Sequence, residues 1–149
     1  MSSVVTVQRQ PGVLFLCVHN AGRSQMAAGW MRHLAGDLIR VFSAGSAPAE
    51  TLNPAAVEAM AEVGIDISEA EPMVWTDQMA SDVEVVVSMG CGDRCSTYPG
   101  TRLVDWDVAD PAGQGLEMVR AVRDEIEIRV RGLVDDLVSD SDGVTEKRK

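Results

Sequence analysis

The chain has 149 residues, 46% of them hydrophobic, and a formal net charge of -10 at pH 7. This length suits one hydrophobic core and is too short for two ordinary domains, so we expect a single domain over residues 1–149. The acidic balance argues against a nucleic-acid-binding surface. It also supplies no long-range field that would attract an anion, so any bound anion must be held by local groups.

No stretch of the chain has the composition of a membrane anchor or a secretion signal. The longest uninterrupted apolar run, residues 13–18, is far shorter than the roughly 20 residues of a membrane helix. Residues 1–12 lack an apolar segment followed by a small-residue cleavage site. We therefore expect a cytoplasmic protein with no membrane partner, in which cysteines serve reactive or redox chemistry rather than permanent disulfides.

The apolar pattern alternates between strand and helix along the chain. One helix boundary is especially clear, because Asn53 is a good N-cap, Pro54 suits the first helical position and Gly64 is a usual stop. In chain order the predicted elements are strand 13–18, helix 24–35, strand 40–44, helix 54–63, strand 83–88, strand 101–105 and helix 116–138.

This alternation predicts an α/β fold with a parallel sheet, helices on both faces and right-handed crossovers. In such a fold ligands bind beyond the carboxyl ends of the strands. The core should extend over about residues 12–138. The first few residues and the polar tail after 138 have little to bury, and we expect both to be frayed.

Residues 17–24 read C-V-H-N-A-G-R-S, between the first predicted strand and the first predicted helix. Backbone N–H groups and the dipole at a helix N-terminus favour an anion, and Gly22 lets the loop curl so that these groups face inward. The loop is therefore interpreted as a cradle for a tetrahedral oxyanion. Its candidate oxyanion-binding residues are Val18, His19, Asn20, Ala21, Gly22, Arg23 and Ser24.

The side chains of this loop suit nucleophilic chemistry on such an anion. Arg23 offers a planar fork for two oxygens, and the positive field favours the thiolate form of Cys17, a nucleophile. Ser24 can donate a hydrogen bond to the thiolate, and Asn20 can pin the loop. The alternative is a core cysteine at a strand end followed by an N-cap serine, but the combined spacing of Cys, Arg and Ser favours a catalytic site.

Asp110 is the candidate general acid, within the stretch D-W-D-V-A-D-P-A-G after the fourth predicted strand. A carboxyl group at this edge of the sheet can protonate a departing oxygen. Pro111 fixes its position, whereas Asp105 and Asp107 are interpreted as solvated or structural. The alternative is a Mg²⁺ site; no further ligands follow at motif spacing, so we expect no metal.

Two more cysteines, Cys91 and Cys95, occur in M-G-C-G-D-R-C-S at 89–96, after the third predicted strand. On a helix their β-carbons would be about 5–6 Å apart, farther than the ~3.8 Å of a disulfide. The glycines of this stretch make the necessary unwinding easy. The alternatives are packing cysteines or half of a zinc site, but a second ligand pair is missing because His19 and His33 stand alone.

The opening loop resembles the signature of the low-molecular-weight tyrosine phosphatase superfamily, C-x5-R-[ST] between the first strand and the first helix. The similarity to its arsenate reductase branch covers residues 13–134 and includes R-S-Q-M-A, S-A-G, N-P-A-A-V-E-A-M, G-I-D-I-S and D-P. It implies a three-layer α/β sandwich whose four-stranded parallel sheet has the order 2-1-3-4. It further implies Cys17 as nucleophile, Arg23 as oxyanion clamp, Ser24 as thiolate donor, Asn20 as loop brace and Asp110 as general acid.

The same resemblance implies reduction of arsenate to arsenite, a step of arsenic detoxification. Cys17 would bind arsenic covalently, and Cys91 would then attack Cys17. Cys95 would attack Cys91 in turn, which leaves a Cys91–Cys95 disulfide that thioredoxin reduces. Glutathione and mycothiol are alternative reductants. We expect a monomer without a tightly bound cofactor, in which phosphate or sulfate can mimic arsenate.

The main alternative is a phosphomonoesterase of the tyrosine phosphatase type, because phosphate and arsenate share shape and charge. Such phosphatases commonly carry aromatic residues after D-P, where this chain has P-A-G-Q-G. The sequence therefore favours the reductase. A non-catalytic oxyanion sensor is a third possibility, but a sensor needs no general acid.

Overall fold

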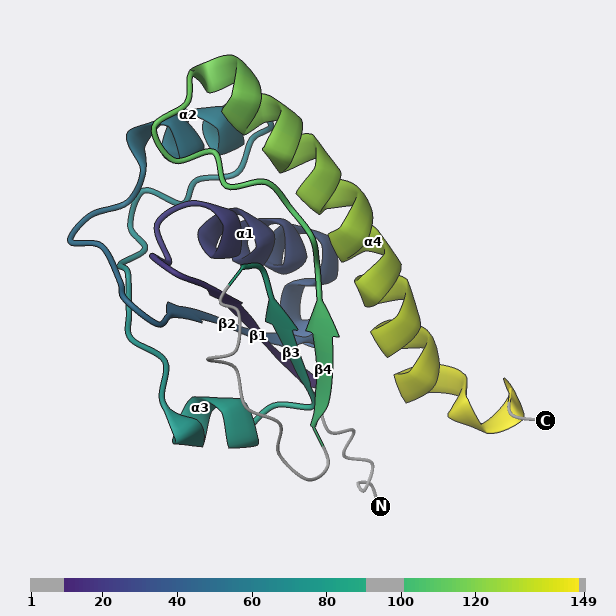
Figure 1. Ribbon diagram of the computed structural model, residues 1–149. Helices are drawn as coiled ribbons and strands as arrows, with labels where there is room; N and C mark the ends of the chain where they lie inside the picture. Colours follow the sequence, from purple (N-terminus) through teal and green to yellow (C-terminus); the bar gives the residue numbers. More distant parts are fainter. Residues whose placement is uncertain (1–9, 91–100, 148–149) are drawn as a thin grey trace.

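The fold is built on a four-stranded parallel sheet with the strand order β2-β1-β3-β4 (Figure 1), which confirms the expected order. The computed structural model describes residues 10–90 and 101–147. Strand β1 lies in the middle and is buried along its whole length. The strands are β1 (Gly12–Cys17), β2 (Arg40–Gly45), β3 (Val85–Ser88) and β4 (Arg102–Asp105).

The register brings the carboxyl ends of the strands to one edge of the sheet. Cys17 is the partner of Gly45 on β2, and the preceding Leu16 is the partner of Ser88 on β3. Ser88 is in turn the partner of Asp105 on β4. The loops that follow all four strands therefore emerge together, which is where ligands bind in parallel α/β sheets.

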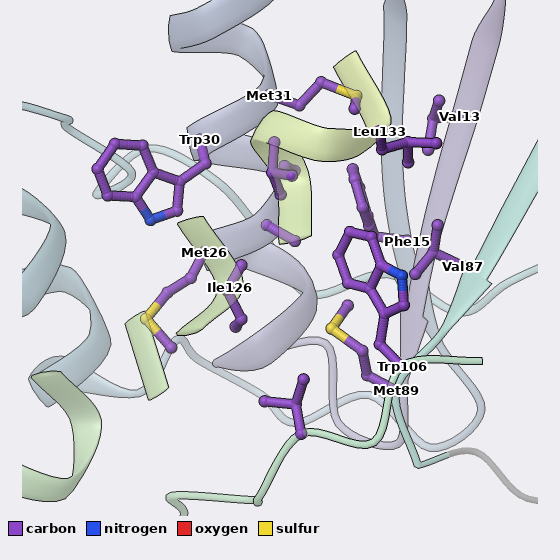
Figure 2. Packing of buried hydrophobic residues seen from close by; sticks show 14 of the residues in the cluster. Val13, Phe15, Met26, Trp30, Met31, Val87, Met89, Trp106, Ile126 and Leu133 are labelled. Atoms are coloured by element: carbon purple, nitrogen blue, oxygen red, sulfur yellow. The ribbon is translucent and has the colours of Figure 1, made fainter. Parts of the chain in front are cut away.

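Helices cover both faces of the sheet, as the alternation predicts (Figure 1). Helices α1, α2 and α4 lie on one face of the sheet, and the short α3 lies on the other. One cluster of buried apolar residues lies on each face. The larger cluster is shown in Figure 2. Within it the ring centroids of Phe15 and Trp106 are 5.8 Å apart. The helices are α1 (Arg23–Ala35), α2 (Pro54–Glu62), α3 (Asp77–Ser81) and α4 (Leu116–Lys147), with a 3₁₀ turn, η2, at Gly36–Leu38.

Helix α2 begins as predicted, and ion pairs join it to α4. The side chain of Asn53 caps its N-terminus by accepting a hydrogen bond from the Ala55 N–H. At its other end Glu62 contacts Arg120 at 2.7 Å and Arg123 at 2.9 Å. The hydrogen bonds from Arg120, supported by Arg123, lower the pKa of Glu62 from 4.5 to about 2.

Apart from shifts of one residue at the ends of other elements, the structure differs from the sequence prediction at three places. Strand β3 begins at Val85 rather than at residue 83, and α3 was not predicted because five residues are too few for a helical period. The predicted end of the last helix at residue 138 was too early, since α4 continues to Lys147. Propagating an existing helix adds one hydrogen bond per residue, and this tail contains no proline. Residues 1–9, also predicted to be frayed, lie outside the described residues.

Within residues 10–90 and 101–147, none of the helices combines the length and the apolar character needed to cross a bilayer.

Candidate active site

A small cavity of about 50 Å³ opens between the β1–α1 loop and the loop that follows β4. It lies at the N-terminus of α1, where Gly22 is the N-cap and no side chain caps the helix. The first N–H groups of a helix have no intrahelical partner, so they remain free to bind an anion. The lining residues are Cys17, His19, Ala21, Gly22, Arg23, Asn53, Asp110, Pro111 and Ala112.

The Cys17 thiol, 2% exposed, is joined to a buried hydrogen-bond network behind the cavity. Its Sγ lies 2.9 Å from Ser24 Oγ. The side-chain amide of Asn20 donates to the same oxygen at 2.7 Å. Because Ser24 Oγ accepts from Asn20, its own hydrogen is available to Cys17 Sγ. The network therefore offers a donor to the sulfur.

Asn20 has a left-handed backbone conformation within the loop. Asn20 has a φ of 51°, in the left-handed region that asparagine tolerates better than most residues. Gly22, the N-cap of α1, has a φ of -134° and a ψ of -86°. Asn20 is fully buried and lies behind the cavity together with Ser24, neither of them lining it.

Arg23 joins the Cys loop to the loop that follows β4. Its side chain is 7% exposed, and Nη1 donates to the Val108 carbonyl at 3.1 Å. Nη2 lies 3.5 Å from Asp110 Oδ2. The other oxygen of Asp110 accepts from the Ala112 N–H at 3.0 Å, which orients the half-exposed carboxylate toward the cavity that it lines. The structure thus brings three of the candidate catalytic residues, Cys17, Arg23 and Asp110, to one cavity.

Two glycines allow neighbouring chain segments to approach this loop closely. A Cβ on Gly45, at the end of β2, would lie 2.5 Å from the Val18 carbonyl oxygen. A Cβ on Gly90, which follows β3 with a φ of 89°, would lie 2.7 Å from Arg23 Nη1. Neither position can carry a side chain without moving the cradle. Gly90 directly precedes Cys91 in the chain.

The remaining loop residues are placed as follows. The Val18 and His19 carbonyls accept hydrogen bonds from Ala47 at 2.8 Å and Ala49 at 3.0 Å. His19 is exposed and lines the cavity, whereas Val18 is half-buried and does not. His33 lies exposed on α1, with its ring edge-on to Trp30.

Several contributors to the site were not predicted from the sequence as site residues. Asn53 was identified only as a helix cap, although it also lines the cavity and its N–H donates to the Ala21 carbonyl at 2.9 Å. The Val108 carbonyl accepts a hydrogen bond from Arg23, and Gly90 leaves room for the Arg23 guanidinium, both from far along the chain. Local spacing carries no signal for such contacts.

The other acidic and sulfur candidates stand apart from the cavity or outside the described residues. Asp105 accepts a hydrogen bond from Ser88 Oγ at 3.0 Å, and Asp107 is exposed and does not line the cavity. Among residues 10–90 and 101–138, no three histidine, cysteine, aspartate or glutamate side chains gather to hold a metal ion. Cys91 and Cys95 lie outside the described residues.

A cysteine at the end of the first parallel strand, beneath an uncapped helix N-terminus and beside a buried arginine, defines the class of cysteine-dependent enzymes that act on tetrahedral oxyanions. The family model described as low molecular weight phosphotyrosine protein phosphatase matches residues 12–143. The chain belongs to this family.

Relatives within the family carry arsenate reductase names. The chain is 41% identical to the arsenate reductase of Bacillus subtilis over 129 residues, covering 80% of this chain and 91% of the relative. Among solved structures it resembles a thioredoxin-dependent arsenate reductase of Corynebacterium glutamicum, with a TM-score of 0.75 and 40% identity. That match covers 86% of this chain and 61% of the other, so this chain spans about three fifths of the neighbour's length. A structure titled as an arsenate reductase in the phosphate binding state matches with a TM-score of 0.76 and 36% identity, covering 85% of this chain and 98% of the other.

Proposed function

We propose that this protein reduces arsenate to arsenite, with Cys17 as the nucleophile, Arg23 as the oxyanion clamp and Asp110 as the general acid. The observation that carries the proposal is the cavity that these three residues line in front of the uncapped N-terminus of α1. An oxyanion bound there meets backbone N–H groups, a buried guanidinium and a carboxyl group that can give up a proton.

In the first step the Cys17 thiolate attacks the arsenic atom of bound arsenate. An S–As bond forms while one As–O bond breaks, and the departing oxygen takes a proton from Asp110 and leaves as water. Arsenic stays in the +5 state in this covalent adduct. Arg23 and the loop N–H groups hold the remaining oxygens, and Ser24 is placed 2.9 Å from the reacting sulfur.

In the second step the Cys91 thiolate attacks Cys17 Sγ. An S–S bond forms, and the S–As bond breaks with its electron pair going to arsenic, which leaves as arsenite in the +3 state. The two thiols supply the two electrons. Cys95 then attacks Cys91 and frees Cys17, and thioredoxin, a dithiol, reduces the Cys91–Cys95 disulfide. The position of Gly90, which directly precedes Cys91 in the chain and lies close to Arg23, supports Cys91 as the attacking thiol.

Two observations favour arsenate over an aryl phosphate ester. No phenylalanine, tyrosine or tryptophan from the described part of the chain lines the cavity, so an aromatic ring of a substrate has no stacking partner there. The relatives named above are arsenate reductases, and the thioredoxin-dependent neighbour supports thioredoxin as the reductant. We further propose that the chain works as a cytoplasmic monomer without a tightly bound cofactor.

The test is a coupled assay with NADPH, thioredoxin reductase and thioredoxin, run with arsenate and separately with p-nitrophenyl phosphate. The proposal predicts arsenate-dependent NADPH oxidation in the wild-type protein and none in Cys17→Ser. Rapid aryl phosphate hydrolysis without any arsenate-dependent NADPH oxidation would contradict it.

That contrary result would establish the second candidate, a phosphomonoesterase. The description of the family favours this candidate, and the same cavity suits the phosphate group of an ester. Hydrolysis would proceed through Cys17, Arg23 and Asp110 alone. Replacing Cys91 would then leave turnover unchanged, whereas it should abolish turnover of the reductase.

A further inference from the structure

Gln25 is a buried neutral side chain in the first turn of α1, and it lies one residue beyond the cradle signature. It is 2% exposed and does not line the cavity. Its side-chain nitrogen donates to the Asn20 main-chain carbonyl at 3.1 Å and to Asn20 Oδ1 at 3.1 Å, and it reaches the Glu71 carbonyl at 3.4 Å. A buried amide with this many acceptors around one nitrogen is held in a single orientation.

These contacts also fix the orientation of Asn20. Asn20 Oδ1 accepts from Gln25 and, at 2.9 Å, from the Met73 N–H, so both of its acceptor sites are used. The Asn20 amide nitrogen must then face the other way, where it donates to Ser24 Oγ at 2.7 Å. Ser24 is left with its own hydrogen for Cys17 Sγ.

We propose that Gln25 is a positioning residue that sets the direction of the hydrogen bonds running through Asn20 and Ser24 to Cys17. Without the Gln25 donor, Asn20 Oδ1 keeps one donor and the amide can turn over. Its oxygen would then face Ser24 Oγ, and Ser24 would donate to Asn20 instead of to the Cys17 sulfur. The thiolate would lose its donor although no residue that touches it had changed. This inference rests on the proposed function only in taking Cys17 as the nucleophile.

The test measures the rate of Cys17 alkylation by iodoacetamide against pH, in a Cys91→Ser/Cys95→Ser background where Cys17 is the only thiol. Gln25→Met keeps the length of the side chain and removes the N–H donor. We expect the midpoint of its alkylation profile to move up by about one pH unit, equal to about tenfold less thiolate at a pH below both midpoints. The matched control is Gln78→Met, an exposed glutamine on α3, which should leave the midpoint in place.

The same pair of measurements in a Ser24→Ala background separates positioning from general loss of structure. If Gln25 acts through Ser24, Gln25→Met adds no further shift once Ser24 Oγ is gone, because the two changes break one chain of hydrogen bonds. If Gln25→Met does not fold, Gln25→Glu takes its place in the alkylation test. Glutamate has the shape of glutamine and no N–H donor when it is ionised. Any direct effect of its charge on Cys17 persists in the Ser24→Ala background, whereas the positioning effect disappears.

An unchanged midpoint in a folded Gln25 variant, or an equal shift with and without Ser24, would overturn the proposal. Alkylation needs neither arsenate nor thioredoxin. Failure of arsenate reduction with a Gln25-dependent midpoint would therefore count against the proposed function alone.

Discussion

The guanidinium of Arg23 and the carboxylate of Asp110 lie 3.5 Å apart at the cavity that both residues line. Arg23 is buried and Asp110 is half exposed, so this contact joins a buried guanidinium to a carboxylate that solvent can reach. An oxyanion that binds to Arg23 competes with Asp110 for the same guanidinium. The proposed clamp and the proposed acid are therefore coupled before any substrate arrives.

Asp110→Asn should separate binding from chemistry. We expect turnover to fall by roughly 10²–10⁴-fold, the usual contribution of a general acid. Phosphate should bind at least as tightly as to the wild-type protein, because Arg23 loses a competing carboxylate. Calorimetric titration with phosphate and steady-state turnover measure the two effects. Asp107→Asn is the control, since Asp107 is exposed in the same loop and does not line the cavity; weaker phosphate binding specific to Asp110→Asn would contradict the coupling.

Arg23→Lys should weaken oxyanion binding although the positive charge is kept. A lysine cannot reproduce the planar fork, and it gives up one of the contacts that Arg23 makes to Val108 and Asp110. Losing one charge-assisted hydrogen bond corresponds to about ten- to hundredfold in affinity. The measurement is the phosphate concentration that half-protects Cys17 from alkylation. Equal protection in both proteins would show that charge alone holds the anion.

Gly90→Ala tests the close contact between the residue before Cys91 and the clamp. The new Cβ would lie 2.7 Å from Arg23 Nη1, so the guanidinium must move and phosphate binding should weaken. Gly64→Ala is a matched control, because Gly64 has a φ of 83° with nothing near its Cβ position. Both variants should lose about 1–2 kcal/mol of stability from the left-handed backbone. Only Gly90→Ala should bind phosphate more weakly than the wild-type protein. Equal phosphate affinities of Gly90→Ala and Gly64→Ala would show that the space at Gly90 does not matter for the position of Arg23.

The sequence predicted the part of the site that one short segment encodes. Cys17, Arg23 and Ser24 were correctly placed where the first strand gives way to the first helix, and Asn53 was correctly placed as the cap of α2. These predictions succeeded because loop, cap and helix start are set by neighbours in the chain.

The sequence did not predict what depends on contacts between distant segments. Several loops converge at one edge of the sheet, and this convergence places Arg23 beside Val108 and Gly90. It also brings Gln25 to the Glu71 carbonyl. The full length of α4 was also missed, because the apolar period of the sequence fades after residue 138.

Glu62 should make stability depend on acid pH. Hydrogen bonds from Arg120 lower its pKa in the folded protein from 4.5 to about 2, so the folded state favours the carboxylate. Its contribution is present above about pH 4.5, the value for the unfolded chain, and is lost as pH falls toward 2. Urea midpoints between pH 6 and pH 3 should fall less in Glu62→Gln than in the wild-type protein. Glu58→Gln, an exposed change on the same helix, should keep the wild-type slope, and an identical slope in Glu62→Gln would contradict the assignment.

The most direct test of the proposed relay is the amount of arsenite released by reduced protein after one addition of arsenate without any external reductant. The account predicts about one arsenite per chain from the wild-type protein and from Cys95→Ser, with a Cys17–Cys91 disulfide trapped in that variant. It predicts none from Cys17→Ser, and none from Cys91→Ser, which should stop at the covalent adduct. Release of arsenite by Cys91→Ser, or its full turnover with thioredoxin, would contradict the intramolecular relay and leave an external thiol as the group that attacks Cys17.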